Sequence, residues 1–210
     1  MPVAQDKRYA TGNTYMQYVI EERETWYENF LKDQFDDLST VKFLEIGAGS
    51  GSNIEFFKRM GLKANHILAN ELIPERVEML RINHPDIQIF AGDATLLKPE
   101  MIGKCDVIFQ STVFTSILDK TFREKLAQTM MSLLSERGII LWYDFIFDNP
   151  SNPDVKKVTV EELRVLFPQL RWQVKKVTLA PPLGRRVGRM YPMLNAFPFL
   201  RTHIVAVGRA

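Results

Sequence analysis

Residues 41–53 read VKFLEIGAGSGSN, and this stretch decides the fold. Its first five residues are apolar except for Lys42 and the closing Glu45, as in a buried strand. Three glycines at alternate positions follow, and the amphipathic run IEFFKRM then opens a helix. Glycines allow positive φ and leave bare backbone for a ligand, while the start of a helix directs free N–H groups at it. Strand, glycine turn and helix are the opening of a nucleotide-binding βα unit.

The spacing of these glycines narrows the choice of ligand. It is G-x-G-x-G, not the G-x-G-x-x-G of the dinucleotide fingerprint, and no Gly-Lys-Ser/Thr follows as in a phosphate loop. With Glu45 at the strand end, the pattern resembles the first motif of class I S-adenosylmethionine-dependent methyltransferases, (D/E)-h-G-x-G-x-G. The alternatives are a dinucleotide-binding fold and a purely structural turn. The resemblance implies an α/β fold with a Rossmann-like, seven-stranded, mostly parallel sheet, its last strand antiparallel, and helices on both faces.

Two more carboxylates end strands of their own. Glu71 closes HILANELI (66–73), 20 residues after the third glycine, where an acidic residue can accept hydrogen bonds from both ribose hydroxyls. Asp93 in IQIFAGDAT (87–95) matches the family's Asp that accepts a hydrogen bond from the adenine amino group. A solvated helix-entry carboxylate and a Gly-Asp turn are the alternative interpretations. We expect S-adenosylmethionine to contact Glu45, Gly47, Ala48, Gly49, Gly51, Asn53, Glu71, Leu72, Asp93, Ala94, Gln110 and Ser111.

The remaining periodicity predicts the other elements. Apolar residues at helical spacing from Asn13 predict an amphipathic helix or helix pair. Asp119 is a plausible N-cap of a helix that places Thr121, Arg123 and Glu124 in an exposed register. Thr159 begins a capping box, T-x-x-E, for a short helix. Further strands are predicted at 105–110, 138–145, 171–180 and 202–209, and further helices at 74–83 and 119–135.

A twenty-residue insert, PPLGRRVGRMYPMLNAFPFL (181–200), separates the last two predicted strands. In a sheet whose last strand is antiparallel, the preceding strand runs up to the cofactor edge, so the insert must lie over the mouth of the site. We therefore expect a substrate lid. It carries three arginines and no acidic residue, and its aromatic residues could equally dock a second subunit or a membrane surface. The expected substrate-binding residues are Thr112, Arg185, Arg186 and Tyr191.

Asp144, Asp148 and His203 are the candidates for a general base at the carboxyl edge of the sheet. We predict catalytic roles for Asp144 and His203, although Asp144 could instead bind a metal or fix a loop, and His203 could be structural. His84 is expected to lie away from the site. Asn149 and Pro150 read as a turn rather than a catalytic motif. There is no His/Cys cluster with metal-ligand spacing, so no metal site is predicted.

The composition limits the kinds of partner that we expect. The formal net charge of +2 gives no case for a chain-wide nucleic-acid surface, so no DNA partner is expected and RNA is unlikely. A single cysteine, Cys105, fits a reducing compartment, so we expect a cytoplasmic protein. No apolar run is long enough to span a membrane, so we expect no integral membrane contact. Homo-oligomers are possible. We expect an N-terminal helical cap at 1–40, where Tyr9 and Tyr15 could form a flap, and a methyltransferase domain at 41–210.

Three functions remain open from the sequence. The first is O-methylation of a saccharide or another small polar acceptor, the second is RNA methylation, and the third is a non-catalytic scaffold of methyltransferase fold. QSTVFTSILD, LWYDF with NPSNPDV, VTLAPPL and LRTH resemble a bacterial subgroup associated with surface-polysaccharide gene sets. This resemblance implies a glycan or nucleotide-sugar hydroxyl as the acceptor. An arginine-rich lid fits such a substrate, because guanidinium groups pair with phosphate in a forked geometry.

Overall fold

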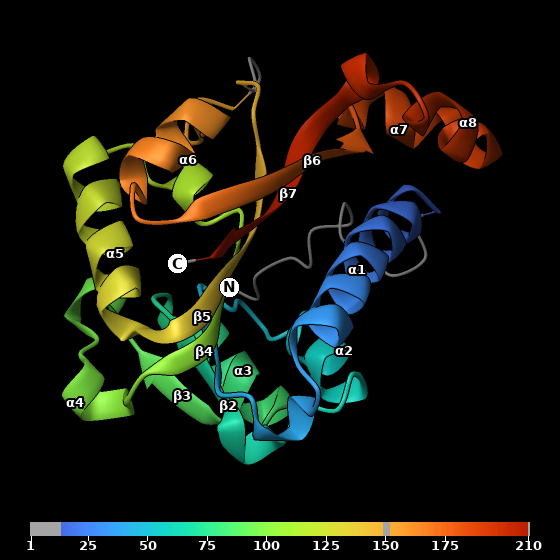
Figure 1. Cartoon of the computed structure of the whole chain (residues 1–210). Coiled ribbons are helices and arrows are strands. Elements are labelled where there is room, and N and C mark those ends of the chain that lie inside the picture. The colour runs from blue at the N-terminus through green and yellow to red at the C-terminus, as the bar shows by residue number, and fades with distance from the viewer. Residues whose placement is uncertain (1–13, 149–151, 210) are drawn as a thin grey trace.

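A computed structural model describes residues 14–148 and 152–209. Its centre is one seven-stranded sheet in the order β3-β2-β1-β4-β5-β7-β6 (Figure 1). Every neighbouring pair is parallel except those of β7, which runs antiparallel to both β5 and β6. The predicted fold class is therefore confirmed. The strands are β1 Phe43–Ile46, β2 Ile67–Glu71, β3 Gln88–Ala91, β4 Cys105–Ser111, β5 Leu134–Phe145, β6 Arg171–Leu179 and β7 Arg201–Arg209.

Helices cover both faces of this sheet, with α5 and α6 on one side and α1 and α2 on the other (Figure 1). None of the helices in the described part of the chain is both long and apolar enough to cross a membrane. The helices are α1 Thr14–Gln34, α2 Ile54–Arg59, α3 Pro74–Asn83, α4 Pro99–Ile102, α5 Lys120–Leu133, α6 Val160–Leu166, α7 Pro181–Val187 and α8 Tyr191–Asn195.

Strand alternation creates two separate apolar cores. In β1, Phe43 faces the core beneath α1 and α2, and Leu44 faces the core beneath α5 and α6. In β5, Tyr143 faces the core beneath α1 and α2, and Trp142 faces the core beneath α5 and α6. Because both faces are covered, these strands are apolar on both sides, as parallel strands in such folds are. Glu45 is the one charged side chain of β1, and it is buried among these apolar residues, which calls for a functional or structural reason.

The N-terminal segment forms one continuous helix rather than a helix pair. Tyr27 and Leu31 of α1 are buried against the sheet, and the Tyr27 hydroxyl donates a hydrogen bond to the carbonyl oxygen of Trp142 at 2.8 Å. Burial raises the pKa of Tyr27, so this hydroxyl stays protonated and remains a donor. Helix α1 thus belongs to the core that the sheet shares with α2.

Two differences from the sequence prediction concern the secondary structure: the start of one strand and three short helices. Strand β5 begins at Leu134 rather than 138, because Leu134 already pairs with Cys105 before a register shift leads into the Val107–Ile139 pairing. The short helices α4, α7 and α8 were not predicted. Four to seven residues complete too few turns to show a helical period.

The predicted exposed position of Arg123 is wrong. Its side chain is buried, and its guanidinium donates to the carbonyl oxygens of Ile117 at 2.7 Å and Lys156 at 3.1 Å and to the Glu162 carboxylate at 2.6 Å. Arg123 precedes Leu126 by three residues, so the two lie on the same buried face of α5. The arginine therefore joins α5 and α6, and Glu162 of the capping box turns toward it.

We expect Arg123→Met to lower the free energy of unfolding by about 3 kcal/mol, because it leaves the half-buried Glu162 carboxylate and two carbonyl oxygens without their donor. Thermal and urea denaturation measure this loss. Arg164→Met, an exposed arginine on α6, is the matched control and should stay within about 0.5 kcal/mol of the parent. Equal effects of the two substitutions would show that the buried cluster does not stabilise the fold.

Candidate functional site

The three glycines of the turn after β1 all have positive φ, at +66°, +60° and +88°. A Cβ on Gly47 would come within 2.6 Å of Val113, and one on Gly51 within 2.3 Å of the His84 ring, whereas one on Gly49 would meet nothing within 4 Å. The outer two glycines are thus required by the protein's own packing, and the middle one borders open space. The expectation that His84 lies away from the site is wrong, since its ring packs against this turn.

Glu45 is buried at the end of β1. Its Oε1 accepts a hydrogen bond from the Asn53 side chain at 2.7 Å, and its Oε2 has no hydrogen-bond partner among the described residues. Burial raises the pKa of the Glu45 carboxyl to about 8, and the bond from Asn53 opposes that rise only in part. A buried carboxyl with one free oxygen is costly for the protein alone, so it points to a cationic or hydrogen-donating ligand.

Arg23 of α1 completes this cluster and was not predicted. Its guanidinium donates to Asn53 Oδ1 at 2.7 Å and to Ser111 Oγ at 3.2 Å, and it lies 5.1 Å from the centre of the Tyr143 ring. A signal was present in the sequence. Arg23 lies four residues from both Val19 and Tyr27, so it occupies the apolar stripe of the helix rather than its polar face.

The other two strand-end carboxylates bind backbone. Glu71 accepts hydrogen bonds from the N–H groups of Leu72 and Ile73 at 2.9 Å and of Gly49 at 2.8 Å, so it ties the glycine turn to the tip of β2. Asp93 accepts from the N–H of Thr95 at 2.8 Å and caps the 3₁₀ turn that contains Ala94. Since β1, β2 and β3 are consecutive in the sheet, the three carboxylates line one edge.

The corner after β4 is held from behind by two buried side chains. Gln110 accepts a hydrogen bond from the N–H of Val113 at 3.0 Å and donates to the carbonyl oxygen of Tyr143 at 3.4 Å. Asp144 accepts from the Thr115 hydroxyl at 2.5 Å, and its Oδ2 has no partner in the described chain. Burial raises the pKa of Asp144 to about 7. Both side chains are fully buried, so they shape the corner from within.

A second polar group lies where β5 and β6 end and β7 begins. The His203 ring stacks on Tyr143 with centroids 5.2 Å apart, and the Tyr143 hydroxyl is 3.0 Å from the Thr178 hydroxyl. Burial, with a smaller effect of the Arg23 charge, lowers the pKa of His203 to about 4, so its imidazole is neutral at pH 7.

Backbone strain gathers around the same tyrosine. Thr112 and Thr178 have φ of +59° and +61°, a conformation that β-branched residues rarely adopt. The N–H of Thr112 donates to the carbonyl oxygen of Tyr143 at 2.8 Å, and Thr178 contacts its hydroxyl. Strained residues of this kind concentrate at functional sites, so the strain marks the same edge as the polar groups do.

The 181–200 insert leaves the sheet at this edge and packs on α1 (Figure 1). Tyr191 is buried, stacks on Tyr18 at 4.9 Å and accepts a hydrogen bond from the N–H of Leu179 at 3.1 Å. It is therefore an anchor of the insert and not an exposed aromatic residue. Arg185 and Arg186, also expected to bind substrate, are exposed.

The other candidate residues lie elsewhere. Asp148 accepts a hydrogen bond from the N–H of Lys157 at 3.0 Å, which holds the pKa of its carboxyl below the usual range, so it fixes a loop. Tyr9, Asn149 and Pro150 lie outside the described residues. Within 14–148 and 152–209, no group of three His, Cys, Asp or Glu side chains could hold a metal ion.

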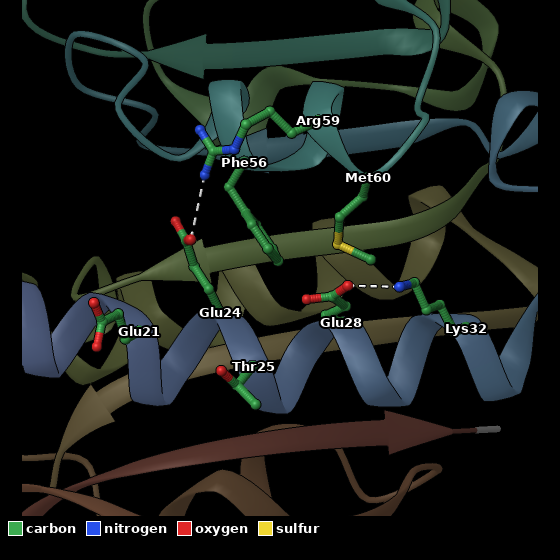
Figure 2. Close-up of a pocket in the computed structure, with 8 residues that line it drawn as sticks. All are labelled: Glu21, Glu24, Thr25, Glu28, Lys32, Phe56, Arg59 and Met60. Carbon is green, nitrogen blue, oxygen red and sulfur yellow. Dashed lines mark hydrogen bonds and ion pairs between the residues drawn. The ribbon is translucent and has the colours of Figure 1, made fainter.

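A groove of about 300 Å³ lies between α1 and α2, with its lining side chains shown in Figure 2. Two of its three carboxylates are paired, Glu24 with Arg59 at 3.3 Å and Glu28 with Lys32 at 2.5 Å. None of its lining residues comes from the glycine turn or from a strand end. This groove is therefore separate from the strand-end edge that carries Glu45, Glu71 and Asp93.

The residues at the strand-end edge fit S-adenosylmethionine. The free oxygen of Glu45 can take the ammonium group of its methionine end, and the guanidinium of Arg23 beside it can take the carboxylate. The open side of Gly49 leaves room for a ligand against backbone. Leu72, exposed at the tip of β2, offers an apolar surface at the same edge.

Solved structures of the same fold agree with this interpretation. An S-adenosylmethionine-dependent methyltransferase from Mesorhizobium loti is 12% identical with a TM-score of 0.64, covering 91% of this chain and 100% of its own. CalS10, an amino pentose methyltransferase from Micromonospora echinaspora solved with S-adenosylmethionine, is 12% identical with a TM-score of 0.61 over 90% and 91% of the two chains. A TehB-like methyltransferase from Corynebacterium glutamicum is 14% identical with a TM-score of 0.60 over 87% and 85%.

At such low identity these structures show the fold alone, and no curated protein sequence matches the chain. The sequence model of the thiopurine S-methyltransferase (TPMT) family matches residues 55–188, which is more than half of the chain. The cofactor and the class of enzyme follow from that match together with the fold. The chain belongs to the thiopurine S-methyltransferase (TPMT) family, and it is an S-adenosylmethionine-dependent methyltransferase.

Proposed function

We propose that the protein methylates a hydroxyl group of a saccharide or of another small polar acceptor. The observation that carries this proposal is the polar group formed by Tyr143, Thr178 and His203, at the edge where the cofactor residues lie. The Tyr143 and Thr178 hydroxyls are buried and bonded to each other, so the half-buried imidazole of His203 is the group of this set that can contact an acceptor hydroxyl. Bound S-adenosylmethionine supplies an electrophilic methyl group. The protein's task is then to orient the acceptor and exclude water, which can lower the barrier by about 7–11 kcal/mol.

For the cofactor, we propose that Glu45 and Arg23 hold the two charged groups of the methionine end. Glu71 accepts from the ribose hydroxyls with the capacity that its backbone partners leave on Oε2, and Asp93 accepts from the adenine amino group. The short chain Arg23–Asn53–Glu45 supports the first assignment, since it sets a cation and an acid side by side at bonds of 2.7 Å.

For the acceptor, we propose His203 as the general base. Its neutral imidazole can take the hydroxyl proton as the new bond to oxygen forms, and such transfer contributes about 10²–10⁴ in rate. Asp144 has a pKa closer to neutrality, but its Oδ1 accepts hydrogen bonds from the Thr115 hydroxyl and from the N–H of Phe145. We therefore assign Asp144 to positioning the strand end rather than to contact with the acceptor.

Other acceptors are distinguished by specific features. The family is named for an S-methyltransferase, and a thiol needs less help from a base than a hydroxyl. CalS10 acts on an amino pentose, so a sugar acceptor is compatible with this fold. The net charge of +2 speaks against an RNA substrate, and the buried acid of Glu45 speaks against a scaffold that binds no cofactor. A surface-polysaccharide acceptor stays a prediction from the sequence.

The acceptor class is tested by incubating the protein with methyl-labelled S-adenosylmethionine and a panel of nucleotide sugars, free sugars, an aromatic thiol and an RNA oligonucleotide. We expect label in a sugar. His203→Ala should lower kcat by about 10²-fold or more without changing the Kd of the cofactor, and His66→Ala, at the start of β2, is the matched control. Label in the thiol with full activity of His203→Ala would contradict the proposal.

Cofactor binding should release a proton at neutral pH. The Glu45 carboxyl has a pKa of about 8 in the free protein and is mostly protonated, whereas an ammonium group beside its free oxygen would lower that pKa. Affinity should therefore rise from roughly pH 6 to pH 8. Calorimetry in buffers of different ionisation enthalpy counts the proton. In Glu45→Gln the release should vanish, and its persistence there would assign the proton to another group.

Arg23→Met should weaken S-adenosylmethionine binding at least tenfold, about 1.4 kcal/mol, because the carboxylate of the methionine end loses its cation. Binding of 5′-methylthioadenosine, which lacks that end, should stay unchanged. Arg59→Met, an exposed arginine at the α1–α2 groove, is the control and should affect neither ligand. Equal losses for both ligands in Arg23→Met would mean that the arginine supports the fold of the site instead of binding the carboxylate.

A further inference from the structure

The outer surface of the insert differs from the rest of the protein surface. Its exposed large apolar side chains are Met190, Met193, Phe197 and Phe199, with 54%, 56%, 47% and 77% of their surface exposed. These four lie within ten residues of one another. A second group, Leu72, Ile73, Met79 and Ile82, lies at the tip of β2 and on α3, but that segment also carries Glu75 and Glu78, whereas residues 181–200 contain no acidic residue. Exposed apolar side chains that gather on one segment, with Phe197 and Phe199 in contact, are typical of an interaction site.

The opposite side of the insert explains why these side chains face outward. Tyr191 packs in the core, Asn195 donates to the Glu22 carboxylate at 2.8 Å, and a Cβ on Gly184 would come within 2.4 Å of the Tyr15 ring. The insert is thus held firmly on α1 by one side. Its exposed residues are therefore presented by a fixed backbone rather than by a free loop.

The charge of the segment identifies the partner. Residues 181–200 carry Arg185, Arg186 and Arg189 and no acidic residue, in a chain whose net charge is only +2. All three arginines are exposed. Apolar side chains rimmed by arginines are the composition of segments that lie in the interface of an anionic bilayer, where the rings enter the headgroup region and the cations pair with phosphates.

We propose that this outer face of the insert docks on the surface of an anionic lipid bilayer. Docking would hold the cofactor edge against the membrane, because the insert starts at the carboxyl end of β6 and returns at the start of β7. An acceptor that reaches the site would then lie at the bilayer surface. The proposal depends on the exposed face alone and not on the identity of the methyl acceptor.

Two other partners fit the same face less well. A two-fold dimer through it would bring the three arginines of one copy against those of the other, which repel. A single-stranded nucleic acid needs aromatic rings on which bases can stack. Phe197 and Phe199 instead contact each other, with centroids 5.7 Å apart and planes tilted by 48°, so each ring covers part of the other.

Co-sedimentation of the full chain with vesicles tests the proposal. We expect binding to vesicles of phosphatidylcholine that contain phosphatidylglycerol, little binding to phosphatidylcholine alone, and a decrease as salt is raised. Phe199→Ser and the pair Arg186→Glu with Arg189→Glu should each lower partitioning at least fivefold. All of these side chains are exposed, so the variants should fold, which circular dichroism checks.

Matched controls lie far from the insert. Val165→Ser removes an exposed apolar side chain from α6, and the pair Lys125→Glu with Arg137→Glu reverses two exposed charges, on α5 and near the start of β5. Both should bind vesicles like the parent. The proposal is overturned if no vesicle binds, if neutral and anionic vesicles bind equally, or if the controls lose as much as the insert variants. It is also overturned if the insert variants abolish self-association or RNA binding and leave lipid binding unchanged.

Discussion

A buried carboxylate at the tip of the central strand organises this protein. Glu45 lies between apolar strand neighbours, so its charge is costly there, and Asn53 satisfies only one of its two oxygens. Arg23 reaches the same point from α1. This cluster therefore lowers the stability of the protein, because Glu45 Oε2 has no hydrogen-bond partner unless a ligand supplies one. With the proposed cationic ligand group at Glu45, binding would release a proton, because burial raises the pKa of this carboxyl in the free protein.

The N-terminal helix is part of this site as well as part of the core. Arg23 reaches the cofactor edge from α1, Tyr27 seals the helix on β5, and Glu22 holds the insert through Asn195. One helix therefore links the sheet, the cofactor edge and the insert.

Much of the fold and part of the site were predictable from the sequence. The seven-stranded, mostly parallel sheet with its antiparallel last strand follows from the resemblance that the glycine motif carries, and Glu45, Glu71 and Asp93 lie at the ends of three neighbouring strands. Arg23, Arg123 and the packing of His84 were missed. Each is a polar residue whose role depends on an element far along the chain, such as the contact of Arg123 with Glu162, and local periodicity carries no information about such contacts.

The sequence by itself determined the class of fold and, through the family resemblance, the cofactor, because glycine spacing and strand-end carboxylates are local patterns. Only the tertiary structure decided which side chains complete the site. It placed Arg23 beside Asn53, buried Tyr191 on α1 and left Phe199 outward, since burial and hydrogen-bond partners are set by how distant elements pack. The sequence gives the chemical type of each residue, but the burial and neighbouring charges that shift its pKa arise only on folding.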